Sequence, residues 1–240
     1  MNFTPILHIP HSSKIIPENY KKYFIDENEV NETILKLTDT FTDDLFDDNL
    51  SKKIIFPYSR VFCDVERFVG KDEIMNEYGQ GVIYNNGING KIFKDQPKEV
   101  DTEILNNFYF PHIEKIKSLV KETNNPLIID CHSFSNEIYK TTPFTDIGDV
   151  DFCIGYNERD IKSEFLAEAG KKFLEDLGFK TEINFPYRGA YSVFSVPSVM
   201  IEVNKRLYLS EDYVSKLSDY YKIKQIIKLF IDKILKYENQ

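Results

Sequence analysis

Short apolar runs alternate along the chain with longer stretches in which apolar residues recur every three or four positions. The apolar runs are rich in Ile, Val and Phe and lie at residues 5–9, 54–63, 127–131, 152–155, 179–183 and 199–203. Their length and polar flanks predict β-strands, whereas the periodic stretches at residues 29–37, 43–52, 101–122, 162–177 and 210–237 predict helices. This alternation favours the α/β class, with a central mixed, mostly parallel sheet flanked by helices.

The last periodic stretch carries the clearest helix signal, because its apolar side chains fall mostly at three- and four-residue steps. Ser210 is its expected N-cap. Residues 70–96 are rich in Gly and Asn and predict an irregular excursion over the surface. No internal repeat or long linker divides the sequence, so residues 1–240 are predicted to form one catalytic domain.

Composition narrows the class of protein. Hydrophobic residues make up 42% and charged residues 29%, as in ordinary globular proteins. The formal net charge of -9 argues against nucleic acid or an anionic membrane as partner. The three cysteines are widely spaced and predict neither a disulfide framework nor a zinc ribbon. We find no signal peptide or membrane-spanning run and expect a cytoplasmic protein.

The segment PLIIDCHSFSN, residues 126–136, is the most informative for chemistry. A predicted strand ends there in Asp130 and His132, followed by the hydroxyl residue Ser133. Ligands of open α/β sheets bind outside the carboxyl ends of strands. His132 is therefore a candidate metal ligand, with Asp130 and Ser133 as supporting groups. The alternative is a strand-end histidine that is only hydrogen-bonded to a carboxylate.

Two other segments offer metal ligands. His11 follows the first predicted strand directly after Pro10, whereas His8 lies within the run and is expected to be a hydrogen-bonded strand histidine. Asp39 and Asp43 in LTDTFTDDLF would share one face of a helix, and either could supply an oxygen ligand. The neighbouring acids in this segment are interpreted as a solvated helix start.

Glu202 interrupts the apolar run of the last predicted strand. A carboxylate in such a run needs a charge partner or a polar cavity. It could form a salt bridge with Lys205 or Arg206, or it could act as a general base beside a metal-activated water.

Three arginines are candidate holders of a substrate carboxylate, because a guanidinium donates two parallel hydrogen bonds. Arg60 and Arg67 flank SRVFCDVER, interpreted as a strand leaving the sheet, and Arg188 lies in PYRGAY with Gly189 and Tyr191. Each arginine could instead form a structural ion pair.

These segments together resemble the N-formylglutamate amidohydrolase family. The resemblance covers nearly the whole chain and rests on six motifs in the same order: PHSS, TDTFTDDLF, SRVFCDVER, DCHSFSN, PYRGAY and MIEVNKRLY. It implies a fold related to zinc carboxypeptidases, with His11 and His132 as zinc ligands and Glu202 as general base. The implied activity is zinc-dependent hydrolysis of N-formyl-L-glutamate to formate and L-glutamate.

The chain departs from the family pattern at two places and from carboxypeptidases at a third. Glu66-Arg67 stands where Asn-Arg is usual, Gly189-Ala190 stands where a Gly-Gly pair is usual, and Lys14 occupies the place of the glutamate ligand of carboxypeptidases. The third ligand must then be an aspartate, and we predict Asp43, with Asp39 as the alternative. The departures also keep open an amidase or carboxypeptidase acting on another acylated amino acid or a cell-wall peptide, or a non-catalytic metal-binding relative.

Overall fold

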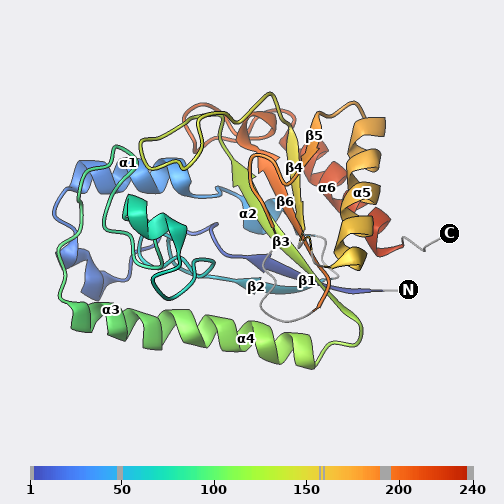
Figure 1. Ribbon diagram of the computed structural model, residues 1–240. Coiled ribbons are helices and arrows are strands. Elements are labelled where there is room, and N and C mark those ends of the chain that lie inside the picture. Colours follow the sequence, from blue (N-terminus) through green and yellow to red (C-terminus); the bar gives the residue numbers. More distant parts are fainter. Residues whose placement is uncertain (1–2, 48–50, 157, 159, 190–195, 237–240) are drawn as a thin grey trace.

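A six-stranded sheet forms the centre of the computed structural model, which describes residues 3–47, 51–156, 158, 160–189 and 196–236 (Figure 1). Its strand order is β2-β1-β3-β6-β4-β5. Neighbouring strands are parallel except β4 and β6, which are antiparallel. The strands are β1 (Thr4–Ile9), β2 (Lys52–Ile55), β3 (Pro126–Phe134), β4 (Phe152–Tyr156), β5 (Thr181–Ile183) and β6 (Ser198–Asn204). The predicted α/β class with a mixed, mostly parallel sheet is confirmed.

Helices cover the sheet. They are α1 (Glu27–Leu37), α2 (Thr42–Leu45), α3 (Lys98–Ile104), α4 (Phe110–Lys121), α5 (Ile161–Asp176) and α6 (Tyr220–Leu235). A π-helical turn (Leu105–Tyr109) joins α3 to α4, and short 3-10 helices occur at η1 (Glu18–Tyr23), η2 (Ile74–Tyr78) and η4 (Lys205–Leu207). Asp26 and Asp160 cap α1 and α5, because each side chain accepts a hydrogen bond from a first-turn backbone N–H. No helix in the described part of the chain is long and apolar enough to span a membrane.

The alternation of side chains along each strand divides the interior into two cores. Leu127 and Ile129 of β3 pack with apolar residues of α5 and α6 on one face of the sheet. Ile128 packs on the other face with residues of α3 and α4. Figure 1 shows these two helix pairs on different sides of the molecule. Because side chains alternate between faces, Asp130 and His132 belong to the face of Ile128.

The apolar run at residues 54–63 was predicted as one strand, and this is wrong beyond Ile55. Pro57 follows closely and cannot donate a ladder hydrogen bond. The chain then turns, with Phe62 N–H donating to Ser59 O at 2.9 Å. Phe62 and Cys63 are fully buried but pack with α3 and α4. The run is apolar because it is buried, not because it is extended.

Two helix predictions are also corrected. Among the described residues of the stretch at 43–52, the helix is limited to the single turn of α2, which ends at Leu45, and β2 begins at Lys52. The last helix begins at Tyr220, so Ser210 does not cap it. Instead the Asp212 side chain accepts hydrogen bonds from the backbone of Val214 and Ser215, and this local turn competes with helix formation.

Candidate active site

The strand register brings chemically active side chains onto one face of the sheet. His132 of β3 lies in register with Glu202 of β6, and His8 of β1 lies in register with Asp130 of β3. Registered residues of neighbouring parallel strands project to the same face, so these side chains gather near the carboxyl ends of the central strands. Ligands of open α/β sheets bind at this edge.

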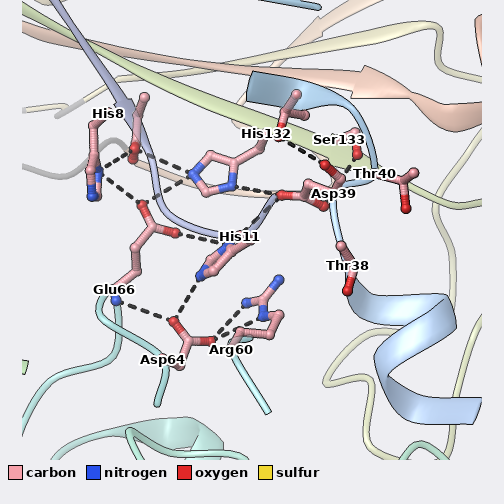
Figure 2. Close-up of polar contacts among 12 residues, drawn as sticks. His8, His11, Thr38, Asp39, Thr40, Arg60, Asp64, Glu66, His132 and Ser133 are labelled. Atoms are coloured by element: carbon pink, nitrogen blue, oxygen red, sulfur yellow. Dashed lines mark hydrogen bonds and ion pairs between the residues drawn. The ribbon is translucent and has the colours of Figure 1, made fainter. Parts of the chain in front are cut away.

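His11, Asp39 and His132 form a buried group that could hold a metal ion (Figure 2). One ligand atom from each residue lies within 4.8 Å of the others. The Oδ2 atom of Asp39 is 3.2 Å from Nδ1 of His132 and 3.7 Å from Nδ1 of His11. Two imidazole nitrogens and one carboxylate oxygen are a ligand set that zinc binds in hydrolases.

Asp39 is fixed in this group by the segment that follows α1. Its backbone N–H donates to the carbonyl of His11 at 3.0 Å, and Ser133 Oγ donates to its Oδ1 atom at 3.2 Å. Burial alone would raise the pKa of Asp39, but polar contacts with His11 and His132 and the charge of Lys205 lower it below its usual range. Asp39 is therefore an ionised ligand candidate.

Asp43, our predicted third ligand, does not join the two histidines. It is exposed on α2, whereas Asp39, the alternative, is only 2% exposed. Phe41 between them adopts φ 69°, a left-handed conformation that reverses the chain direction. The helical spacing that would have placed both aspartates on one face is absent. Of the two aspartates, Asp39 is therefore the one that lies beside His11 and His132.

A carboxylate orients His11. Asp64 is fully buried, accepts hydrogen bonds from Arg60 and from the Tyr84 hydroxyl, and lies 2.9 Å from Nε2 of His11. Although burial opposes its charged form, Arg60 and His11 hold the pKa of Asp64 well below its usual range. His11 must therefore donate through Nε2, which leaves a lone pair on Nδ1. This buried Nδ1 has no hydrogen-bond partner among the described residues, as expected of an atom reserved for a metal.

Carboxylates also orient His132 through its Nε2 atom. Its Nε2 atom lies 3.1 Å from Glu66 Oε1 and 3.3 Å from Asp130 Oδ1. Because both neighbours are acceptors, Nε2 carries a proton, and Nδ1 either donates to Asp39 when the imidazole is charged or presents a lone pair to a metal ion when it is neutral. Two acceptors 3.2 Å apart repel unless a cation or proton lies between them. Burial lowers the pKa of His132, but the charges of Glu66 and Asp130 raise it well above its usual range. The surroundings of His132 thus stabilise a positive charge at this point.

A second histidine group supports Asp130. Nδ1 of His8 lies 2.9 Å from Asp130 Oδ1, and Nε2 of His8 lies 3.0 Å from Nε2 of His112. Burial lowers the pKa of His112 to about 3, so this imidazole is neutral. His8, Glu66 and Asp130 could also hold a metal ion by proximity. Both ring nitrogens of His8 are nevertheless hydrogen-bonded, in contrast to Nδ1 of His11.

Glu202 lies on β6, in register with the candidate metal ligand His132 of β3. It is 7% exposed, and its Oε2 atom has no hydrogen-bond partner in the described part of the chain. Burial raises the pKa of Glu202 to about 8. The alternative salt bridges are not found, because Arg206 pairs with Asp149 and Asp151 and the Lys205 ammonium donates to the carbonyl of Lys36.

A cleft opens over the site and carries mostly positive charge. Four cations and two carboxylates line it: Lys36, Arg60, Arg67, Lys205, Asp39 and Glu137. The excursion at residues 70–96 also contributes to its wall, through Met75, Gln80 and Tyr84. In a chain of net charge -9, this local excess of cations favours an anionic ligand.

The predicted arginines differ in their surroundings. Arg60 is engaged with Asp64 and Tyr84. Arg67 lies 3.6 Å from Asp64, and its buried Nε atom has no hydrogen-bond partner among the described residues. Arg188 and Gly189 do not line the cleft, and Arg188 is exposed. Tyr191 falls outside the described residues.

Sequence reasoning assigned no role to Asp64 or Tyr84, and it named Lys205 only as a possible salt-bridge partner of Glu202. A signal for Asp64 was available, because it is a single acid inside the apolar run VFCDV, as Glu202 is in its strand. Tyr84 and Lys205 carried no comparable signal, because their roles depend on contacts with residues distant in sequence.

The chain is similar to known proteins in sequence and in fold. A family model described as N-formylglutamate amidohydrolase matches residues 4–209. A crystal structure of N-formylglutamate amidohydrolase from Ralstonia eutropha is 18% identical, with a TM-score of 0.81, covering 98% of this chain and 94% of that chain. A gene product of Agrobacterium tumefaciens is 15% identical, with a TM-score of 0.67, covering 97% and 92%. These two structures establish a shared fold. No curated protein sequence matches the chain.

Proposed function

The chain belongs to the N-formylglutamate amidohydrolase family and is an amidohydrolase, and on this premise we propose that it is a zinc enzyme that cleaves N-formyl-L-glutamate. The products would be formate and L-glutamate. The observation that carries the proposal is the buried group of His11, Asp39 and His132 beneath a cleft lined mostly by cations.

The donor set fits a zinc ion. Nδ1 of His11 is buried without a hydrogen-bond partner among the described residues, and Nδ1 of His132 faces an ionised Asp39. Asp64 and Asp130 would hold the two imidazoles in the tautomer that leaves Nδ1 free for the ion. When bound at these residues, zinc supplies Lewis acidity, which polarises the amide carbonyl and lowers the pKa of water to roughly 7.

Glu202 would transfer the protons. It accepts a proton from the attacking water as the oxygen bonds to the acyl carbon, and it returns that proton to the amide nitrogen as the carbon–nitrogen bond breaks. Its pKa of about 8 keeps it mostly neutral in the metal-free protein. A cation held at the adjacent histidines favours the ionised form that a base requires. Arg67 would hold a substrate carboxylate through its available donors.

Metal content and formate release test the proposal together. The purified protein is treated with a chelator, reloaded with zinc, and assayed with N-formyl-L-glutamate and N-acetyl-L-glutamate. We expect about one zinc ion per chain, zinc-dependent release of formate and slower cleavage of the acetyl compound. Zinc binding without cleavage of either compound would favour a non-catalytic relative. Cleavage that persists in the chelated protein would disprove the role of the metal.

A further inference from the structure

We infer that Lys205 binds one carboxylate of a dicarboxylic N-acyl amino acid while Arg67 binds the other, so that Lys205 determines specificity for an acidic substrate. This inference rests on the proposed function and adds a residue to it. Of the four cleft cations, Lys205 and Arg67 are the two that have no carboxylate within hydrogen-bond distance among the described residues.

The fold places Lys205 at the active site. It begins η4 directly after β6, three residues beyond Glu202. The side chain of Asn204 caps this turn by accepting from the backbone N–H of Arg206 at 3.1 Å. The Lys205 side chain is only 7% exposed and lines the cleft, with its ammonium 4.0 Å from Oδ1 of Asp39. A ligand held there would lie beside the proposed metal.

The ammonium of Lys205 is incompletely satisfied. It has three N–H donors, and one of them reaches the carbonyl of Lys36 at 2.8 Å. Asp39 Oδ1 at 4.0 Å is beyond hydrogen-bond distance. In the part of the chain that the structure describes, the Lys205 ammonium has no other hydrogen-bond acceptor. A buried cation with open donors in a cleft is suited to an incoming carboxylate.

The remaining cleft cations already have partners. The Lys36 ammonium is 2.6 Å from Glu137, and the Arg60 guanidinium donates twice to Asp64. Arg67 has only a 3.6 Å ion pair with Asp64, and its buried Nε atom has no hydrogen-bond partner in the described residues. Two cleft cations that lack a carboxylate at hydrogen-bond distance therefore match a substrate with two carboxylates.

The test compares three substrates by formate release. N-formyl-L-glutamate has both carboxylates, N-formyl-L-glutamine lacks the side-chain carboxylate, and N-formyl-L-isoglutamine lacks the α-carboxylate. Lys205→Met keeps the aliphatic stem and removes the charge. We expect it to lower kcat/KM for N-formyl-L-glutamate by about 10- to 100-fold. One of the two amides already lacks the carboxylate that Lys205 binds. For that amide we expect kcat/KM to change by less than about threefold.

Controls separate specificity from structure. Lys205→Arg should recover part of the preference for N-formyl-L-glutamate. Lys36→Met removes a charge that is paired with Glu137, and it should not abolish this preference. An equal loss on all three substrates, or the same change in preference from Lys36→Met, would overturn the inference.

A binding measurement distinguishes failure of the inference from failure of the proposed function. L-Glutamate and L-glutamine are titrated calorimetrically into wild type, Lys205→Met and Lys36→Met as purified. If none of the formyl compounds is cleaved, the proposed function fails. Loss of L-glutamate binding in Lys205→Met but not in Lys36→Met would still support the carboxylate site. Unchanged L-glutamate binding in Lys205→Met would overturn it.

Discussion

Replacing Glu202 with Gln separates a role in proton transfer from a role in stability. The substitution preserves side-chain shape but removes the basic oxygen. Glu202 is 7% exposed, and its Oε2 atom has no hydrogen-bond partner in the described residues. Because neither Lys205 nor Arg206 forms a salt bridge with it, the substitution breaks no ion pair with them. We therefore expect Glu202→Gln to fold and to bind zinc.

The raised pKa predicts the sign of the stability change in the metal-free protein. Burial raises the pKa of Glu202 from 4.5 to about 8. Between these values the unfolded chain releases a proton that the folded chain keeps, so the stability of the wild type falls as pH rises through this window. At about pH 7 this cost is at most about 3 kcal/mol. Gln does not titrate, so metal-free Glu202→Gln should be more stable than wild type near pH 7 and equally stable near pH 4.

Activity should change in the opposite direction. General base catalysis contributes about 10² to 10⁴ in rate, so the zinc-loaded variant should lose turnover by that factor. Zinc content, chemical unfolding of the chelated protein at several pH values and formate release are measured on one preparation. A stable, zinc-loaded Glu202→Gln protein with undiminished turnover would refute its role as the base. A variant that loses stability at pH 7 would show that the carboxylate has an unrecognised structural partner.

Three further predictions concern Asp39, Arg67 and the buried Lys94. Asp39→Asn should weaken zinc binding by more than about 100-fold, because even groups that only orient metal ligands contribute about 10- to 100-fold to affinity. The matched control Asp43→Asn should bind zinc normally. If calorimetry shows the reverse, Asp43 is the ligand. Arg67→Ala should raise KM for N-formyl-L-glutamate, and exposed Arg188 should tolerate the same change; equal kinetic effects would contradict the assignment of the cleft. Burial lowers the pKa of Lys94 from 10.5 to about 7. This shift lowers the free energy of unfolding by up to roughly 5 kcal/mol below pH 7, and the loss becomes smaller as pH approaches 10.5. Lys94→Met should therefore raise the free energy of unfolding near pH 7, with the gain shrinking toward pH 10; a destabilised variant would show that the ammonium contributes net stability.

The strands were predictable because most are buried on both faces. Five of the six predicted apolar runs correspond to strands whose ends differ by up to three residues, as with β3. The run at residues 54–63 failed because hydrophobicity records burial and not backbone conformation, and Phe62 is buried in a turn. The stretch at residues 210–219 failed for a related reason. Tyr213 fits the helical periodicity but is buried at φ 59° in a turn.

The candidate site was predictable only in part, because its parts come from separate segments. His11, His132 and Glu202 each follow or interrupt an apolar run, and this local signal is visible in one sequence. The choice of Asp39 depends on the conformation of Phe41, which local pattern does not specify. The support of His11 by Asp64 depends on a contact spanning 53 residues, which no helix or strand period encodes.

The position of Glu202 is determined by the packing of the opposite face of its strand. Val199, Ile201 and Val203 are buried against the core formed with α5 and α6. Alternation then directs Glu202 to the other face, and the register with β3 sets it beside His132. A slip of one residue would bury the carboxylate among apolar side chains and turn three apolar residues toward the cleft. The apolar residues of β6 thus fix the register on which the chemistry of Glu202 depends.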